Sequence, residues 1–152
     1  MQIKNARAAL ISNYEVLKLL EEQQHIQKAA QIANPDIEYS EHLRTIQFEL
    51  TEHLKTTPSG TQAPEQLRQY LDRIASFKLT RAEKLQILNL RPKSAVEIYL
   101  LIEECEERFS EDDLGDMLNI VLETLPRDDD EVKEEEEEER GGEGLDEMEQ
   151  DE

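Results

Sequence analysis

Four short signals for the start of a helix recur along this 152-residue chain, and apolar residues spaced three and four apart follow each of them. In each signal a Ser or Thr, the N-cap residue, stands three positions before an acidic residue. The hydroxyl of the N-cap can accept from the N–H of the acidic residue, and the carboxylate can accept from the N–H of the N-cap. The pairs are Ser12 with Glu15, Thr80 with Glu83, Ser94 with Glu97, and Ser110 with Asp113. The pattern predicts an all-α fold.

The N-terminal part of the chain predicts two helices. One covers about residues 12–33 and ends at an Asn-Pro pair, because a residue before proline disfavours helical backbone. A strand over residues 2–4 would need a partner strand from another chain. The second helix covers about residues 40–55, with the apolar stripe Leu43, Ile46, Leu50 and Leu54.

The rest of the chain divides into a linker, a bundle and a tail. Residues 56–63 form a polar run broken by Pro and Gly, which predicts a linker after an N-terminal module of residues 1–55. Residues 64–126 predict a bundle of four helices, since short helices need tertiary burial. Residues 127–152 contain sixteen acids and three bases, a composition typical of disorder. The third bundle helix, which begins at Ser94, has the stripe Ile98, Leu101, Ile102, Cys105 and Phe109.

Charge and motif content exclude several function classes. The net charge of −20 disfavours autonomous nucleic-acid binding, because Lys and Arg supply most of that affinity. Cys105, the single cysteine, lies in an apolar stripe and is flanked by acids, so it predicts a core residue rather than a nucleophile. No metal-ligand spacing surrounds the three histidines, and no Gly-rich phosphate loop is present. No catalytic, cofactor or metal site and no membrane span is therefore predicted.

One local charge feature opposes the acidic total. Residues 78–93 contain five basic residues and one acidic residue, which gives a local charge of +4. This stretch is either a solvated helix surface or a contact patch for nucleic acid or an acidic partner. The five bases are Lys78, Arg81, Lys84, Arg91 and Lys93.

Three stretches carry a resemblance to a known family. Residues 77–92, FKLTRAEKLQILNLRP, and residues 102–109, IEECEERF, are similar to the small stalk subunit of eukaryotic RNA polymerase III. That family is also known as the calcitonin gene-related peptide receptor component. Residues 10–17, LISNYEVL, resemble its opening motif. The helical C-terminal region of these subunits resembles the HRDC domain of helicases and ribonuclease D.

The resemblance implies a non-catalytic, nuclear subunit without a cofactor. Such a subunit forms a heterodimer with a larger OB-fold stalk subunit, joins the polymerase III core and assists initiation factors at promoters, with at most weak nucleic-acid contact through the complex. An HRDC-like bundle follows an N-terminal segment that packs on the partner. Two alternatives stay open: a receptor-associated signalling accessory protein and a free-standing HRDC-like nucleic-acid-binding module. Candidate interface residues are Ile3, Leu10, Tyr14 and Leu17.

Overall fold

The computed structural model describes residues 9–125, and this part of the chain is helical throughout, with seven α-helices, one 3-10 helix and no strand. The predicted all-α class is confirmed. The strand predicted at residues 2–4 and the acidic tail of residues 127–152 lie outside the described residues. The elements are α1 (Asn13–Ala33), α2 (Glu41–Thr56), η1 (Pro58–Gly60), α3 (Pro64–Ile74), α4 (Arg81–Leu90), α5 (Ala95–Leu101), α6 (Cys105–Arg108) and α7 (Glu111–Thr124).

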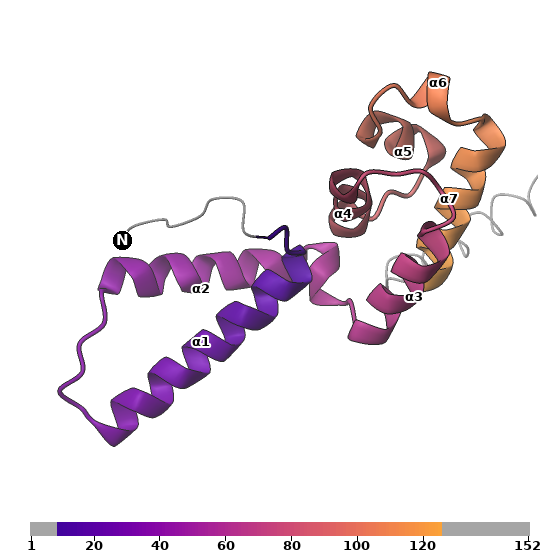
Figure 1. Cartoon of the computed structure of the whole chain (residues 1–152). Helices are drawn as coiled ribbons and strands as arrows, with labels where there is room; N and C mark the ends of the chain where they lie inside the picture. The colour runs from indigo at the N-terminus through magenta and orange to yellow at the C-terminus, as the bar shows by residue number, and fades with distance from the viewer. Residues whose placement is uncertain (1–8, 126–152) are drawn as a thin grey trace, which may run out of the picture.

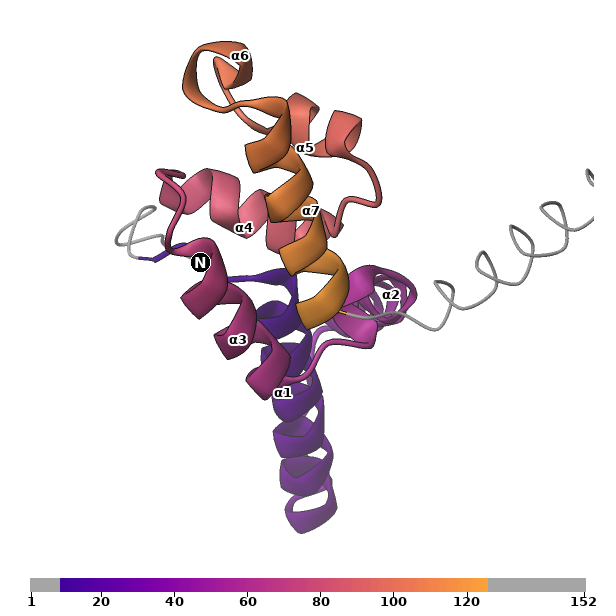
Figure 2. The same cartoon turned by 90° about the vertical axis from the view of Figure 1, so that its right-hand side faces the viewer.

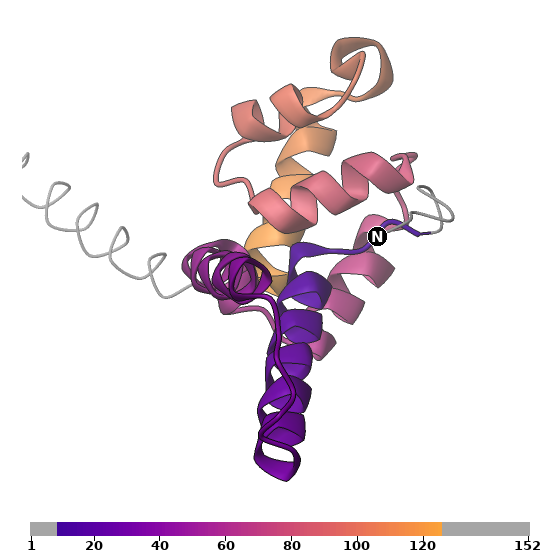
Figure 3. The ribbon, with the colours of Figure 1, turned by 90° about the vertical axis from the view of Figure 1, so that its left-hand side faces the viewer.

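The helices form a two-helix projection beside a compact bundle. Helices α1 and α2 run in opposite directions, contact each other, and separate toward the loop that joins them; we call this pair the helical arm (Figure 1). Helices α3 to α7 pack together at the other end of the molecule, with α7 in contact with both α3 and α5 (Figure 2). The side view in Figure 3 shows α1 extending well away from the bundle.

The base of the helical arm is joined to the bundle by hydrogen bonds to the end of α4. The N–H of Asn13 donates to Oδ1 of Asn89 over 2.9 Å, and Nε2 of Gln62 donates to the carbonyl of Leu88 over 2.9 Å. Both bonds tie segments far apart in sequence. The start of α1 and the chain before α3 are therefore held against the same helix end.

The segment predicted as a linker is an ordered turn in the structure. It contains η1, which contacts α1, α2 and α4, and Ser59 within it is fully buried. Gly60 is required by a close backbone approach, because a Cβ there would lie 2.2 Å from the carbonyl oxygen of Lys55. The turn therefore sets how the helical arm leaves the bundle.

The core lies almost wholly in the bundle. Tyr70 is fully buried, and its hydroxyl donates to the carbonyl of Lys84 over 3.0 Å, which satisfies the one polar group that this ring brings inside. In the helical arm, by contrast, Leu17 and Leu54 are the only large apolar side chains among the described residues that are fully buried. The bundle core includes Ile74, Ile87, Ile98, Met117, Val121 and Leu125.

Three of the four predicted capping boxes are confirmed, at Ser12, Thr80 and Ser110. At the fourth, the Ser94 hydroxyl accepts from the N–H of Glu97 as predicted, over 3.3 Å. The Glu97 carboxylate, however, accepts from the N–H of Lys93 over 2.7 Å rather than from Ser94 itself. The cap at Ser94 is therefore one-sided.

The prediction of one continuous helix from residue 94 to 109 was wrong. The chain leaves helical geometry at residues 102–104 and resumes as α6, with Glu104 in the left-handed region at φ 51°. A continuous helix would place Glu103 and Glu104 over Glu106 and Glu107 at like-charge spacings of three and four, which is unfavourable. The break instead gives the backbone of Glu103 polar partners from α4 and α6.

Candidate partner-docking surfaces

The apolar stripe of α2 is mostly uncovered. Leu54, at the base of the helical arm, is 5% exposed, but Leu43, Ile46 and Leu50 are 49%, 60% and 39% exposed. These three residues lie three and four positions apart and share one helix face, which we call the α2 stripe. The α2 stripe is therefore a candidate contact surface for another molecule.

The candidate interface residues of the opening segment fall into different environments. Leu10 is 69% exposed and its neighbour Ile11 is 47% exposed, so both are accessible to a partner. Tyr14 is half-buried, with Nζ of Lys18 lying 5.7 Å from its ring centroid. Leu17 is 2% exposed and packs inside the chain. Ile3 lies outside the described residues.

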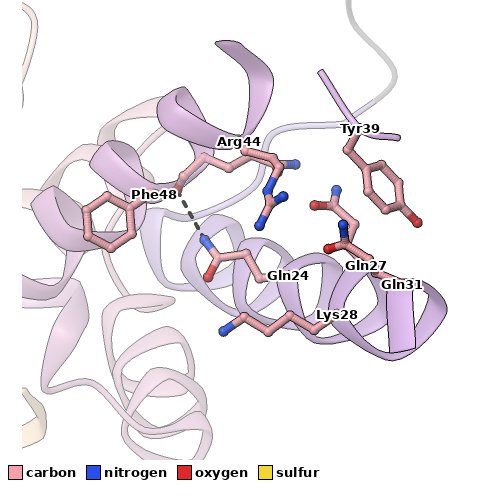
Figure 4. A pocket seen from close by; sticks show the side chains of 8 residues that line it. Gln24, Gln27, Lys28, Gln31, Tyr39, Arg44 and Phe48 are labelled. Atoms are coloured by element: carbon pink, nitrogen blue, oxygen red, sulfur yellow. Dashed lines mark hydrogen bonds between the residues drawn. The ribbon is translucent and has the colours of Figure 1, made fainter. Parts of the chain in front are cut away.

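A polar hollow of about 130 Å³ lies between the two helices of the arm (Figure 4). Nε2 of Gln24 donates across the helices to the carbonyl of Gln47 over 3.3 Å and to Oγ1 of Thr51 over 3.0 Å. Oε1 of Gln47 is buried and has no hydrogen-bond partner within the described residues. The sequence analysis missed this hollow. Half of its lining is glutamine, and the lining residues are Gln24, Gln27, Lys28, Gln31, Tyr39, Arg44, Gln47 and Phe48.

The five bases of the predicted contact patch do not share one surface. Lys78 and Arg81 are exposed and Lys84 is half-buried, and all three lie at or near the start of α4. Lys93 is half-buried beyond the other end of that helix. Arg91 is 2% exposed, and its Nε donates to the carbonyl of Leu125. The structure therefore keeps Lys78, Arg81 and Lys84 at or near the start of α4 and places Arg91 inside.

A two-bond ion pair joins Glu83 of α4 to Arg108 of α6. Nη1 of Arg108 donates to Oε1 of Glu83 over 2.6 Å, and Nη2 donates to Oε2 over 3.1 Å. Glu83 also accepts from the N–H of Thr80 over 2.7 Å in the capping box. The bonds from Arg108, and after them those from Thr80, lower the pKa of the Glu83 carboxyl to about 2.

The other shifted groups have structural causes as well. Burial raises the pKa of the Cys105 thiol, as expected for the predicted core cysteine, and burial also raises the pKa of the Tyr70 hydroxyl. A hydrogen bond to Glu106 raises the pKa of the Tyr99 hydroxyl. Within residues 9–125 no three His, Cys, Asp or Glu side chains gather to hold a metal ion. No helix in the same range is long and apolar enough to span a membrane.

The fold and these surfaces define an all-helical protein in which a small bundle carries a projecting apolar arm. Comparison with known protein families identifies the family of this chain. The profile of the family "RNA polymerase Rpb4" matches residues 10–125, and the chain belongs to this family. It is thereby a non-catalytic stalk subunit of an RNA polymerase, as the resemblance implied.

Individual relatives agree with this assignment. The chain is 37% identical over 132 residues to DNA-directed RNA polymerase III subunit rpc9 of Schizosaccharomyces pombe, covering 83% of this chain and 100% of the relative. It is 30% identical over 112 residues to the subunit of the same name from Dictyostelium discoideum, covering 70% and 78%. A shorter match to RPC9 of Saccharomyces cerevisiae is 42% identical over 57 residues, covering 38% and 35%.

Proposed function

We propose that this chain is a subunit of nuclear RNA polymerase III, that it forms a heterodimer with the larger OB-fold stalk subunit, and that the pair assists initiation at polymerase III promoters. The polymerase is inferred from the relatives, whose names all assign them to RNA polymerase III. The partner and the role in initiation are inferred from the family resemblance.

The uncovered α2 stripe is the observation that supports the heterodimer. An amphipathic helix gains its stability by burying its apolar face, and the part of the chain that the structure describes buries only the Leu54 end of this face. The polar hollow between α1 and α2 adds groups of the kind enriched at protein interfaces, among them Tyr39, Arg44 and Phe48. We therefore propose that the helical arm is the surface that binds the larger stalk subunit.

The division of labour within the chain follows from this assignment. We infer that residues 1–55 form the module that packs on the partner, that residues 56–63 connect it to an HRDC-like bundle of residues 64–126, and that residues 127–152 are a separate acidic tail. The concentration of buried apolar residues in α3 to α7 supports an independent bundle. We propose that the bundle, as part of the heterodimer, contacts the polymerase core and initiation factors.

The heterodimer is tested by the affinity of the full chain for the larger stalk subunit. Replacing Leu43 and Ile46 by Ser removes two exposed apolar side chains of the α2 stripe and should raise Kd at least about tenfold, since central apolar contacts each contribute 1 kcal/mol or more. Isothermal titration calorimetry measures the change. The matched control replaces Leu71 and Leu90, which are 49% and 59% exposed on the bundle, by Ser. Equal affinities of the two double variants would refute the assignment.

We also propose that Lys78, Arg81 and Lys84 make a weak nucleic-acid contact within the complex. In the heterodimer, R81E/K84E should weaken binding of a fluorescent single-stranded RNA several-fold. It should also lower the salt dependence of binding, because fewer phosphate contacts displace fewer counterions from the RNA. The control R68E/R73E makes the same change of net charge on exposed residues of α3. If both variants weaken binding equally, the bases act only through net charge.

A further inference from the structure

The short helix α5 is apolar on both of its faces. Ile98 is fully buried in the bundle core, yet Val96, Tyr99 and Leu100 on the opposite face are 68%, 38% and 75% exposed. These three residues are spaced three and four apart and form one stripe, while Glu97 is the single charged residue of the helix. A helix that is apolar all round is normally buried on all sides. No element within residues 9–125 therefore covers the outer face of α5.

A groove lies beside this uncovered face. It has a volume of about 410 Å³, within the range of protein ligand sites, and runs between α5, α6 and α7. Its floor is apolar, with Cys105, Phe109 and Leu114 contributed by α6, its C-cap and α7. At the rim, the Tyr99 hydroxyl donates to Oε1 of Glu106 over 2.6 Å, and Glu111 also lines the groove. We call this feature the acidic groove.

The charged residues that line the acidic groove have one sign. They are Glu106 and Glu111, and no base of the described residues is part of the lining. A nucleic acid or an anionic lipid surface would be repelled here. So would the acidic C-terminal tail, and a second copy of the chain would bring two acidic rims together. A partner that is both apolar and basic meets no such penalty.

We propose that the acidic groove and the outer face of α5 bind a basic amphipathic helix of a partner protein. Apolar residues of that helix would cover Val96, Tyr99 and Leu100 and enter the groove, in the usual helix-in-groove mode. Its Lys and Arg side chains would face Glu106 and Glu111 at the rim. Nucleic acid and larger acidic proteins are the wrong partners for this surface.

The acidic groove lies at the far end of the bundle from the helical arm. Figures 1 and 2 place α5 and α6 at the end of the molecule opposite the arm. The two surfaces can thus be occupied at the same time, and this second docking site does not depend on what covers the α2 stripe. A failure of one proposal would leave the other unaffected.

A model peptide tests the proposal on the full chain. The probe is a fluorescein-labelled helix with Leu at positions i, i+3, i+4 and i+7 and Lys elsewhere. Fluorescence anisotropy should give a Kd that rises at least about tenfold in the variant V96S/L100S, because two apolar contacts are lost. The controls L71S/L90S and L43S/I46S alter exposed apolar residues in other places and should change Kd less than about twofold. All variants keep the acidic tail, so its attraction for Lys cancels.

Two further measurements distinguish binding in the acidic groove from non-specific charge attraction. E106Q/E111Q should weaken peptide binding and reduce its salt dependence. A peptide of the same composition with scrambled order should bind more weakly than the amphipathic one. Unchanged binding by V96S/L100S, a loss of binding in L43S/I46S instead, or equal affinity for the scrambled peptide would overturn the proposal. So would a concentration-dependent dimer of the full chain that V96S/L100S abolishes, because the face would then be an interface between copies.

Discussion

At the residue scale, Glu83 connects three parts of the bundle. Its carboxylate caps α4 through Thr80, pairs with Arg108 of α6, and accepts a longer bond of 3.4 Å from the N–H of Glu103. Glu83 is 6% exposed, so these bonds are little weakened by solvent. The capping role was predicted from the spacing of Thr80 and Glu83. The partner on α6, Arg108, is 25 residues away in sequence, so no local pattern predicts the ion pair.

The variant E83Q should destabilise the fold by about 2 kcal/mol at pH 7, because Gln can still cap α4 while the half-buried Arg108 loses its counter-charge. The folded-state pKa of Glu83, about 2, lies below its ordinary value of 4.5, so its stabilisation is present above pH 4.5 and is lost as pH falls toward 2. The gap between wild type and E83Q should therefore shrink markedly at pH 3.

Urea denaturation at pH 7 and pH 3 measures this gap. The control is E65Q, which breaks the exposed pair of Glu65 with Arg68 and should leave the denaturation midpoint unchanged. A destabilisation by E83Q that is the same at both pH values would show that the charge of Glu83 does not explain its role.

Arg91 shows where residue-level reasoning from sequence fails. A count of charges assigns it to a basic surface, whereas the structure buries it at the end of α4 with φ 47°, in the left-handed region that glycine usually takes there. Its Nε bond to the carbonyl of Leu125 joins the ends of α4 and α7. That contact spans 34 residues, so neither helix propensity nor charge pattern contains it.

At the element scale, local signals predicted where helices begin more reliably than where they end or what covers them. The starts of α1, α4 and α7 follow from hydrogen bonds within four residues of each Ser or Thr cap. The gap between α5 and α6 was missed because the apolar stripe stays in register across it. In the gap, the backbone of Glu103 bonds to Glu83 and Arg108, and these are tertiary contacts that the local sequence does not contain.

The α2 stripe and the outer face of α5 illustrate a second limit. Periodicity marked Leu43, Ile46 and Leu50 as one apolar face but said nothing about which surface covers it. The outward residues of α5 were hidden in an almost wholly apolar run, AVEIYLL, where no polar face contrasts with an apolar one. Only the arrangement of helices reveals that both faces are open. The two faces accordingly carry the two docking proposals.

At the scale of the whole molecule, the chain combines a stable bundle with a weakly self-supported arm. Nearly all of the large core residues lie in α3 to α7, while nine large apolar residues between Leu10 and Leu50 are exposed. This distribution fits a subunit of the Rpb4 family that is completed by other proteins. The ordered turn around Gly60 and the bonds of Asn13 and Gln62 fix the base of the arm, so the apolar face is presented in a defined direction.

Side-chain footprinting of the heterodimer tests the central claim, that a partner covers the helical arm. Hydroxyl radicals oxidise exposed apolar side chains, and mass spectrometry compares the free chain with the chain bound to the larger stalk subunit. Oxidation of Leu43, Ile46 and Leu50 should fall strongly on binding, while that of Leu71 and Leu90 on the bundle should not change. Equal oxidation of the α2 stripe in the free and bound chain would contradict the account.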